Sequence, residues 1–302
     1  MNRTRVYQGL AFAALAVAWG LNYPFVRLGL EYSSGLWLAF FRAGVGLAGV
    51  SVLMLFLPSR GTLDRAGKRD AMLLGLVNTG LFFGLWFEGA SHVAPGETSV
   101  VIYTFPLWVS LLSAPLLHRR LRNLEWVSVV AGFSGILLVT QVWTIFGPGV
   151  DGFALLEILG GAVCWALATV LFKRRFRAGT FWTANAYQLA GGSGGLLVAA
   201  VALQPGGYGS AAPQLLEVVL YMGLIGTTLA YVLWFALLER LHASTLSNFT
   251  FAVPVVALAA SAAIFGEGLT VFQALGVVLV SAGIFLTGRD VVADAPPPPR
   301  GD

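Results

Sequence analysis

The chain has 302 residues, of which 57% are hydrophobic and only 11% are charged, and its mean hydropathy is +0.80. Soluble domains carry about 25% charged residues, so this composition excludes an ordinary water-exposed surface and indicates a protein embedded in lipid. The formal charge of +4 comes from bases scattered over short loops, without the basic face of a nucleic-acid-binding protein, and a single cysteine, Cys164, excludes internal disulfides and cysteine-rich metal sites.

Ten apolar segments follow one another along the chain, each close to the 20 or so residues that cross a hydrocarbon core. The linkers between them are too short for a soluble domain, so we expect the function to lie within the membrane. We predict an all-α integral membrane protein with ten transmembrane helices, at residues 6–26, 35–57, 70–90, 96–117, 124–142, 153–172, 181–203, 214–238, 243–265 and 270–288.

The first segment has an alternative interpretation as a secretory signal peptide, because Arg3 and Arg5 precede it and residues 16–18 resemble a cleavage site. Its removal would leave nine spans and destroy the repeat described below, so we favour a retained helix. The last residues, 291–302, are rich in proline from Ala295 on and are expected to form a disordered tail.

Positive charge is confined to alternate connections between the expected spans. Sixteen of the 18 Lys and Arg residues lie in these connections and the two ends, and Arg27 and Arg42 are the exceptions. Basic residues accumulate on the cytoplasmic side of membrane proteins. This pattern predicts cytoplasmic N- and C-termini and a multi-pass protein of the bacterial inner, or plasma, membrane.

The two halves of the chain resemble each other. Five spans per half is an odd number, so the second half would enter the bilayer inverted, as in many transporters with a central site. We predict a first repeat at residues 1–142 and a second at 143–290. The landmarks, each separated by 148 positions, are Trp86-Phe87 and Trp234-Phe235, Pro106 and Pro254, Leu121 and Leu269, and Gly135 and Gly283; Trp19 and Trp165, like Arg27 and Lys173, are 146 apart.

Several of these segments resemble the EamA-type members of the drug/metabolite transporter superfamily. The segments are residues 19–25 (WGLNYPF), 40–44 (FFRAG), 241–245 (LHAST) leading to Pro254, and 265–270 (FGEGLT). In general character the chain is most similar to the YddG-like amino-acid exporters. The resemblance implies a central cavity lined by helices 1, 3, 4, 6, 8 and 9, and export of amino acids, including aromatic ones.

Polar and aromatic residues at membrane depth are the candidates for substrate binding. A buried amide or ring can bind substrate in a cavity wall, or it can join helices or sit at the membrane interface. With the resemblance, we expect substrate-binding roles for Trp19, Asn22, Trp86, Tyr103, Trp165, Tyr231 and Asn248. Three prolines inside spans break the backbone hydrogen bonding and are expected either to act as hinges for alternating access or to form static kinks: Pro24, Pro106 and Pro254.

Two charged residues at membrane depth have open roles. Arg42 could attract an anionic group of a substrate, or could anchor the bundle through a carboxylate partner, which we favour. Glu157, one turn inside the sixth span, could bind a coupling proton, or could reach the surface, which we again favour. Glu88 and Glu97 are expected near water.

The sequence lacks a phosphate-binding loop, a nucleophile elbow and a zinc-binding helix, and its three histidines lie on separate loops. We therefore predict no cofactor, metal or catalytic residue. The expected function is secondary transport of small amphipathic metabolites by alternating access, with the substrate and the lipid bilayer as partners and a monomer as the working unit. The alternatives are an exporter of other metabolites or drugs, an intramembrane enzyme acting on a lipid or peptide, and a scaffold without a cavity.

Overall fold

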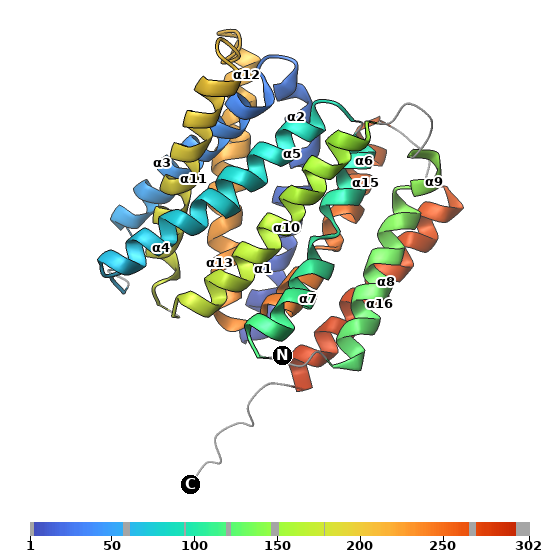
Figure 1. The fold of residues 1–302 in the computed structure, drawn as a ribbon. Coiled ribbons are helices and arrows are strands. Elements are labelled where there is room, and N and C mark those ends of the chain that lie inside the picture. Colours follow the sequence, from blue (N-terminus) through green and yellow to red (C-terminus); the bar gives the residue numbers. More distant parts are fainter. Residues whose placement is uncertain are drawn as a thin grey trace.

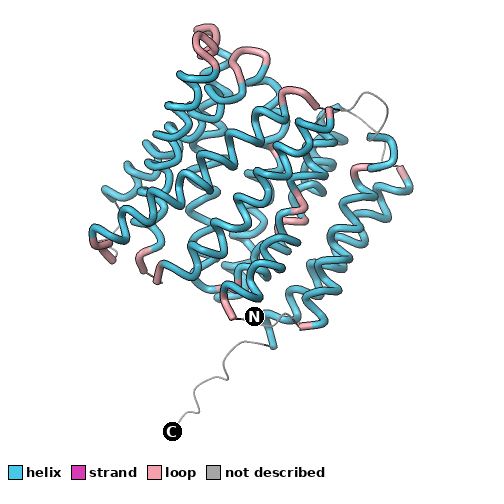
Figure 2. Tube along the Cα trace, in the orientation of Figure 1, coloured by secondary structure: helices cyan, strands magenta, loops and turns pink. Residues whose placement is uncertain are grey.

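The structure is a computed structural model that describes residues 3–56, 61–93, 95–118, 122–145, 151–177, 179–265 and 270–293. These residues form helices and short connections and contain no strand (Figure 2). The tilted helices run side by side between two ends of a bundle (Figure 1). We call the end that bears the basic residues Arg65, Arg175 and Arg240 the inner end, and the opposite end the outer end.

Seven helices in the described residues are long and apolar enough to cross a membrane. They are Tyr7–Leu30, Gly35–Phe56, Arg65–Ala90, Thr98–Leu116, Gly152–Arg175, Phe181–Leu203 and Pro213–Arg240. The other three expected spans coincide with shorter apolar helices, Asn123–Val139, Ala243–Val256 and Val271–Leu286. The all-helical class is confirmed, and the exact number of ten spans stays a prediction.

Several of the long helices are composed of shorter elements. In chain order the elements are α1 (Arg3–Gly20), α2 (Asn22–Leu30), α3 (Gly35–Phe56), α4 (Arg65–Gly75), η1 (Leu76–Leu81), α5 (Phe82–Ala90), α6 (Pro95–Ile102), α7 (Phe105–Leu116), α8 (Asn123–Val139), α9 (Val142–Ile145), α10 (Gly152–Arg175), α11 (Phe181–Leu203), α12 (Pro213–Leu220), η2 (Tyr221–Leu229), α13 (Ala230–Arg240), α14 (Ala243–Phe249), α15 (Ala252–Phe265) and α16 (Val271–Ala293).

The three expected hinge prolines each lie just after a break in a helix. Proline has no N–H, and its ring clashes with the carbonyl four residues earlier, so a helix ends near that position. Helix α1 ends at Gly20 before Pro24, α6 at Ile102 before Pro106, and α14 at Phe249 before Pro254. The prolines thus explain why these spans are split in two.

Within the described residues, two spans contain a π-helix, in which hydrogen bonds join residues five apart. These elements, η1 and η2, occupy corresponding places in the two halves of the chain, directly before α5 and α13. In η2 the hydroxyls of Thr227 and Thr228 donate to the carbonyls of Met222 and Gly223 at 2.9 and 3.0 Å. Such wide turns leave carbonyls available to other groups and often mark functional sites.

Helices α8 and α16 pack together at one side of the bundle (Figure 1). A Cβ atom added at Gly135 would lie 2.7 Å from the Val280 nitrogen, and one at Gly283 would lie 2.9 Å from the Gly132 nitrogen. The contacts therefore run in opposite directions along the two helices, which are antiparallel. Glycine allows this close approach of two backbones.

The C-terminal helix is longer than expected, and some of the expected landmarks are not described. Helix α16 continues to Ala293, so residues 291–293 belong to the helix and not to the expected tail. The landmarks Leu121 and Leu269 and the rest of the tail, residues 294–302, lie outside the described residues.

Candidate substrate-binding cavity

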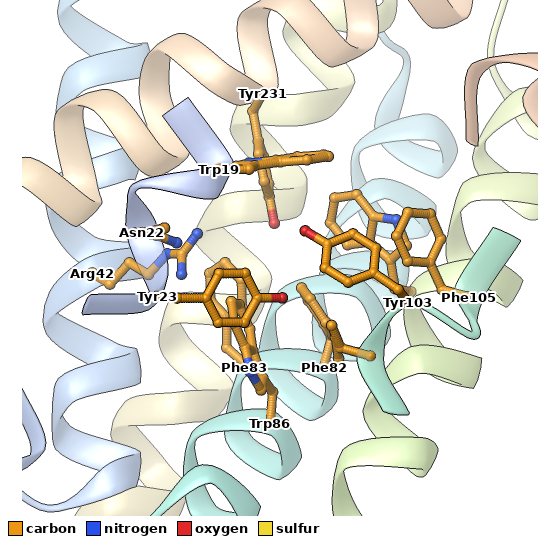
Figure 3. Close-up of a pocket in the computed structure, with 12 residues that line it drawn as sticks. Trp19, Asn22, Tyr23, Arg42, Phe82, Phe83, Trp86, Tyr103, Phe105 and Tyr231 are labelled. Atoms are coloured by element: carbon orange, nitrogen blue, oxygen red, sulfur yellow. The ribbon is translucent and has the colours of Figure 1, made fainter. Parts of the chain in front are cut away.

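A cavity with about 440 Å³ of empty space lies inside the bundle, where six of the expected spans meet (Figure 3). Its wall combines large aromatic rings with one cation and one amide. The residues that line it are Trp19, Asn22, Tyr23, Arg42, Phe82, Phe83, Trp86, Ile102, Tyr103, Phe105, Trp165 and Tyr231.

Six of the seven residues expected to bind substrate come together here, from spans far apart in the sequence: Trp19, Asn22, Trp86, Tyr103, Trp165 and Tyr231. The seventh, Asn248, is buried in α14 and is not among the lining residues. The breaks before Pro24 and Pro106 place Asn22 and Tyr103 at the wall, beside the points where α1 and α6 end.

The aromatic rings form a continuous wall. The Trp19 ring meets Trp165 edge-on, with centroids 5.7 Å apart and an interplanar angle of 80°. Phe82 stacks on Trp86 at 5.4 Å, and Tyr23 lies 6.0 Å from Trp86. Offset and edge-on arrangements at these distances favour ring packing. The wall is therefore suited to the apolar or aromatic body of a ligand.

Arg42 reaches this wall from α3 and is only 2% exposed. Its Nε donates to the Thr227 hydroxyl at 3.0 Å, and its Nη2 donates to the Gly226 carbonyl at 3.1 Å. With the Asn22 amide oxygen facing the guanidinium, Nη1 and Nη2 donate to that oxygen at 2.7 and 3.0 Å. The guanidinium also lies over the Phe83 ring, 4.3 Å from its centroid.

The favoured expectation for Arg42, an anchoring carboxylate, is wrong for the described residues, where all its partners are uncharged. The π-helix η2 supplies them instead. The Gly226 carbonyl accepts from the Trp19 indole as well, at 3.2 Å. A buried charge without a counter-ion is costly, so Arg42 offers a strong site for an anion.

Several polar side-chain atoms of the residues that line the cavity have no hydrogen-bond partner. They are the indole nitrogens of Trp86 and Trp165 and the Tyr231 hydroxyl. In Figure 3 the hydroxyls of Tyr23, Tyr103 and Tyr231 point toward the middle of the cavity. Unpaired buried donors are unfavourable, and a ligand with acceptor atoms would satisfy them.

Sequence reasoning missed Tyr23, Phe82, Phe83, Ile102 and Phe105 as lining residues. Helical spacing contained the signal for two of them, because Phe82 and Phe83 precede Trp86 by one turn. The expected set of lining helices also differs: the second span contributes Arg42, and the ninth contributes none of the described lining residues.

A second pocket adjoins the cavity toward the outer end. It contains about 1020 Å³ of empty space and shares Tyr23 and Trp86 with the central cavity. Its other lining residues include Arg27, Glu31 and Ser91, which are exposed. Only the rings of Tyr23 and Trp86 are common to both spaces, so they lie between the cavity and this outer vestibule.

The inner side of the cavity is closed by packed helices that carry buried polar side chains. Thr169 lies one turn inward of Trp165 on α10, and Ser110 and Ser113 follow Phe105 on α7. Helix α14, which contacts both α7 and α10, contributes Asn248. The side chains of all four residues contain buried polar atoms without a partner. We call these four residues the inner polar cluster.

Links between helix ends also close the inner end. Arg175 donates to the Asp70 carboxylate at 2.7 Å, the Gly179 N–H donates to Glu239 at 2.9 Å, and the Lys173 ammonium donates to the Leu238 carbonyl. At the outer end, Glu88 accepts from Gln204 at 2.7 Å. Glu157 lines a separate groove with Glu88, away from the central cavity.

The chain resembles proteins named as transporters over nearly its whole length. The uncharacterized transporter YvbV of Bacillus subtilis is 27% identical, with 95% of this chain and 92% of YvbV covered. The uncharacterized inner membrane transporter YedA of Escherichia coli K12 is also 27% identical, with 92% and 90% covered. A protein of Salmonella typhimurium named probable amino-acid metabolite efflux pump is 23% identical, with 92% and 93% covered.

One solved crystal structure, 16% identical in sequence, superposes with a TM-score of 0.77 and covers 95% of this chain and 98% of its own. This similarity supports the fold alone. The sequence model of the EamA-like transporter family matches residues 8–141 and 152–289. The protein is therefore a multi-pass membrane protein, and it belongs to the EamA-like transporter family.

Proposed function

We propose that the protein is a secondary transporter that exports small amphipathic metabolites of the amino-acid class, including aromatic ones, by alternating access and without a cofactor. The observation that carries this proposal is the central cavity, in which an aromatic wall meets the uncompensated charge of Arg42. The Salmonella relative named as an amino-acid metabolite efflux pump supports the substrate class and the direction.

The proposal includes a topology of ten spans in two inverted five-helix repeats, with both termini in the cytoplasm. The antiparallel pair α8 and α16, the fifth and tenth expected spans, is what inverted repeats require. The concentration of basic residues at one end of the bundle, with Arg27 and Arg42 as exceptions, supports the orientation. Since one chain supplies both halves of the cavity, we propose that a monomer is the working unit.

In this proposal the described conformation is open outward and closed inward. The vestibule beyond Tyr23 and Trp86 would release substrate, and the inner polar cluster would become the wall of the entry route when the inner end opens. The breaks before Pro24, Pro106 and Pro254 would let the half-helices tilt. Water and substrate would then satisfy the polar atoms that are buried without partners here.

The competing functions fit the cavity less well. A scaffold has no need of a central cavity with unpaired polar atoms in its wall. An intramembrane enzyme would need a nucleophile or an acid pair, and the described lining residues offer tyrosines, tryptophans, an arginine and an amide. Transport uses these groups for binding alone.

Counterflow in proteoliposomes tests the proposal. Vesicles that contain the protein are loaded with unlabelled aromatic amino acid or its derivatives, and uptake of the labelled compound is followed over time. We expect saturable, protein-dependent exchange, reduced at least tenfold in Asn22→Ala. The matched control is Asn185→Ala, which removes a buried amide from α11, outside the cavity. Absence of exchange with every compound would refute the proposal.

A further inference from the structure

The polar groups of the central cavity can all donate hydrogen bonds, and the hydroxyls of Tyr23, Tyr103 and Tyr231 can accept them as well. Indole and guanidinium N–H groups donate and cannot accept, and these are what Trp86, Trp165 and Arg42 present. Asn22 turns its oxygen to Arg42 and is left with its amide N–H₂. None of the described lining residues is acidic. The cavity therefore contains a fixed positive charge and no fixed negative one.

We propose that the transported compounds are carboxylates whose amino group is absent or acylated, with an aromatic or branched apolar body. This inference rests on the proposed function and narrows its substrate class from free amino acids to their deaminated or N-acylated derivatives.

The carboxylate would bind beside Arg42. Of the five guanidinium N–H groups, four donate to Thr227, Gly226 and Asn22, and the fifth, on Nη1, has no acceptor in the described residues. Charge-assisted hydrogen bonds to carboxylates are stronger than neutral ones. The free indole N–H of Trp86 and the free hydroxyl of Tyr231 belong to the same wall and can donate to the second oxygen.

A free α-ammonium group would be unfavourable in the same position. In an amino acid it lies about 2.5 Å from the carboxylate carbon, and hence about 6 Å from a guanidinium that binds that carboxylate. Two like charges at 6 Å and an effective dielectric constant of about 20 repel by an amount equivalent to about 100-fold in affinity. The rings of Phe83 and Trp86, which could attract an ammonium, already face the Arg42 guanidinium at 4.3 and 5.4 Å.

The rest of the ligand would occupy the aromatic part of the cavity. Trp19, Phe82, Phe105 and Trp165 line it with rings, and apolar, aromatic walls with a few polar groups are typical of small-molecule sites. An acyl group on the nitrogen removes the positive charge and adds a carbonyl acceptor, which the unpaired N–H of Trp165 can meet. Both deamination and acylation therefore improve the fit.

Four compounds that share one phenyl ring test the inference on the unmodified protein in nanodiscs. They are 3-phenylpropanoate, N-acetylphenylalanine, phenylalanine and phenethylamine, and binding is read from quenching of tryptophan fluorescence, to which three cavity indoles contribute. We expect the first two compounds to bind at least tenfold more tightly than phenylalanine, and phenethylamine to bind most weakly. Phenylalanine binding as tightly as 3-phenylpropanoate, or failure of both carboxylates to bind, would overturn the inference.

Two further measurements separate this inference from the proposed transport. Arg42→Gln should abolish the preference for carboxylates, and Arg42→Lys should keep part of it; a preference that survives in a folded Arg42→Gln protein would overturn the inference. The same compounds are then assayed by counterflow. Binding with the expected preference but no exchange of any compound would refute transport and leave the site intact, whereas exchange that favours phenylalanine would refute the site and support transport.

Discussion

Arg42 and Asn22 form a pair at the wall of the central cavity: with the amide oxygen turned toward the guanidinium, Nη1 and Nη2 donate to it at 2.7 and 3.0 Å. The two residues lie on α3 and α2, and the pair is completed by the Gly226 carbonyl of η2. A neutral partner orients the cation without cancelling its charge. The pair therefore explains how a buried guanidinium can be held in place and still attract an anion.

Replacement of Asn22 by aspartate tests this arrangement. Asn22→Asp keeps the shape of the side chain but adds a carboxylate that competes with any ligand for Arg42. We expect a folded protein that binds 3-phenylpropanoate at least tenfold more weakly in the fluorescence titration. Asn185→Asp, at a buried amide outside the cavity, is the control for the cost of a new charge in the bundle. Unchanged affinity in Asn22→Asp would mean that Arg42 does not bind the carboxylate.

Gly226→Ala tests the role of the π-helix in holding the pair. A Cβ atom at Gly226 would lie 2.8 Å from the end of the Asn22 amide that is turned away from Arg42, closer than packed atoms tolerate. We expect this variant to displace the amide, to weaken carboxylate binding at least fivefold and to lower thermal stability. The control is Gly44→Ala on α3, where an added Cβ meets nothing within 4 Å and should stabilise the helix by about 0.5–1 kcal/mol. Equal behaviour of the two variants would contradict the argument.

The inner polar cluster should become accessible during transport. Since Cys164 is the only cysteine, a Cys164→Ala background allows single thiols to be placed at will. We expect Ser113→Cys, buried in the described state, to react with a thiol reagent added from the inner side, and to react faster when substrate is exchanging. The control is Thr228→Cys on η2, a buried position whose hydroxyl donates to the Gly46 carbonyl of α3. This thiol should stay unreactive. A Ser113→Cys thiol as inert as this control would exclude an entry route along α7.

The contact between α8 and α16 should be sensitive to a single methyl group. In Gly135→Ala the added Cβ would meet the Val280 nitrogen at 2.7 Å, and a backbone atom cannot move aside cheaply. We expect a loss of about 1–3 kcal/mol of stability, typical of overpacked contacts, seen as a lower melting temperature in detergent. Gly194→Ala, which meets nothing within 4 Å, should leave the melting temperature unchanged or raise it. The reverse order would show that the helices do not pack as described.

The positions of the helices and of most cavity residues could be predicted from the sequence. The length of each apolar run is set by the thickness of the bilayer, so such runs predict membrane-spanning helices. Pro24, Pro106 and Pro254 predict breaks because proline has no N–H and its ring clashes with the preceding turn. Trp19, Trp86 and Trp165 were found because large aromatic residues at membrane depth are candidates for substrate binding in the family that the sequence resembles. These signals are local or periodic, so they can be read without knowing which helices touch.

The partners of Arg42 could not be predicted in this way. They depend on a π-helical turn that exposes the Gly226 carbonyl. No residue type in 221–229 predicts a π-helical turn in the way that proline predicts a break in a helix. For a related reason, the sequence could not show that Asn248 lies outside the wall of the central cavity. Its span carries a buried amide as the first span does, but the break before Pro254 leaves it in the inner polar cluster and not in the cavity wall. Which face of a helix meets a cavity is decided by packing between distant segments.

The glycine-lined contact of α8 with α16 joins the last helix of one half of the chain to the last helix of the other, so it does not depend on the peptide link between the halves. We expect two separate polypeptides, severed between Ile145 and Asp151 and co-expressed, to find each other in the membrane and restore activity.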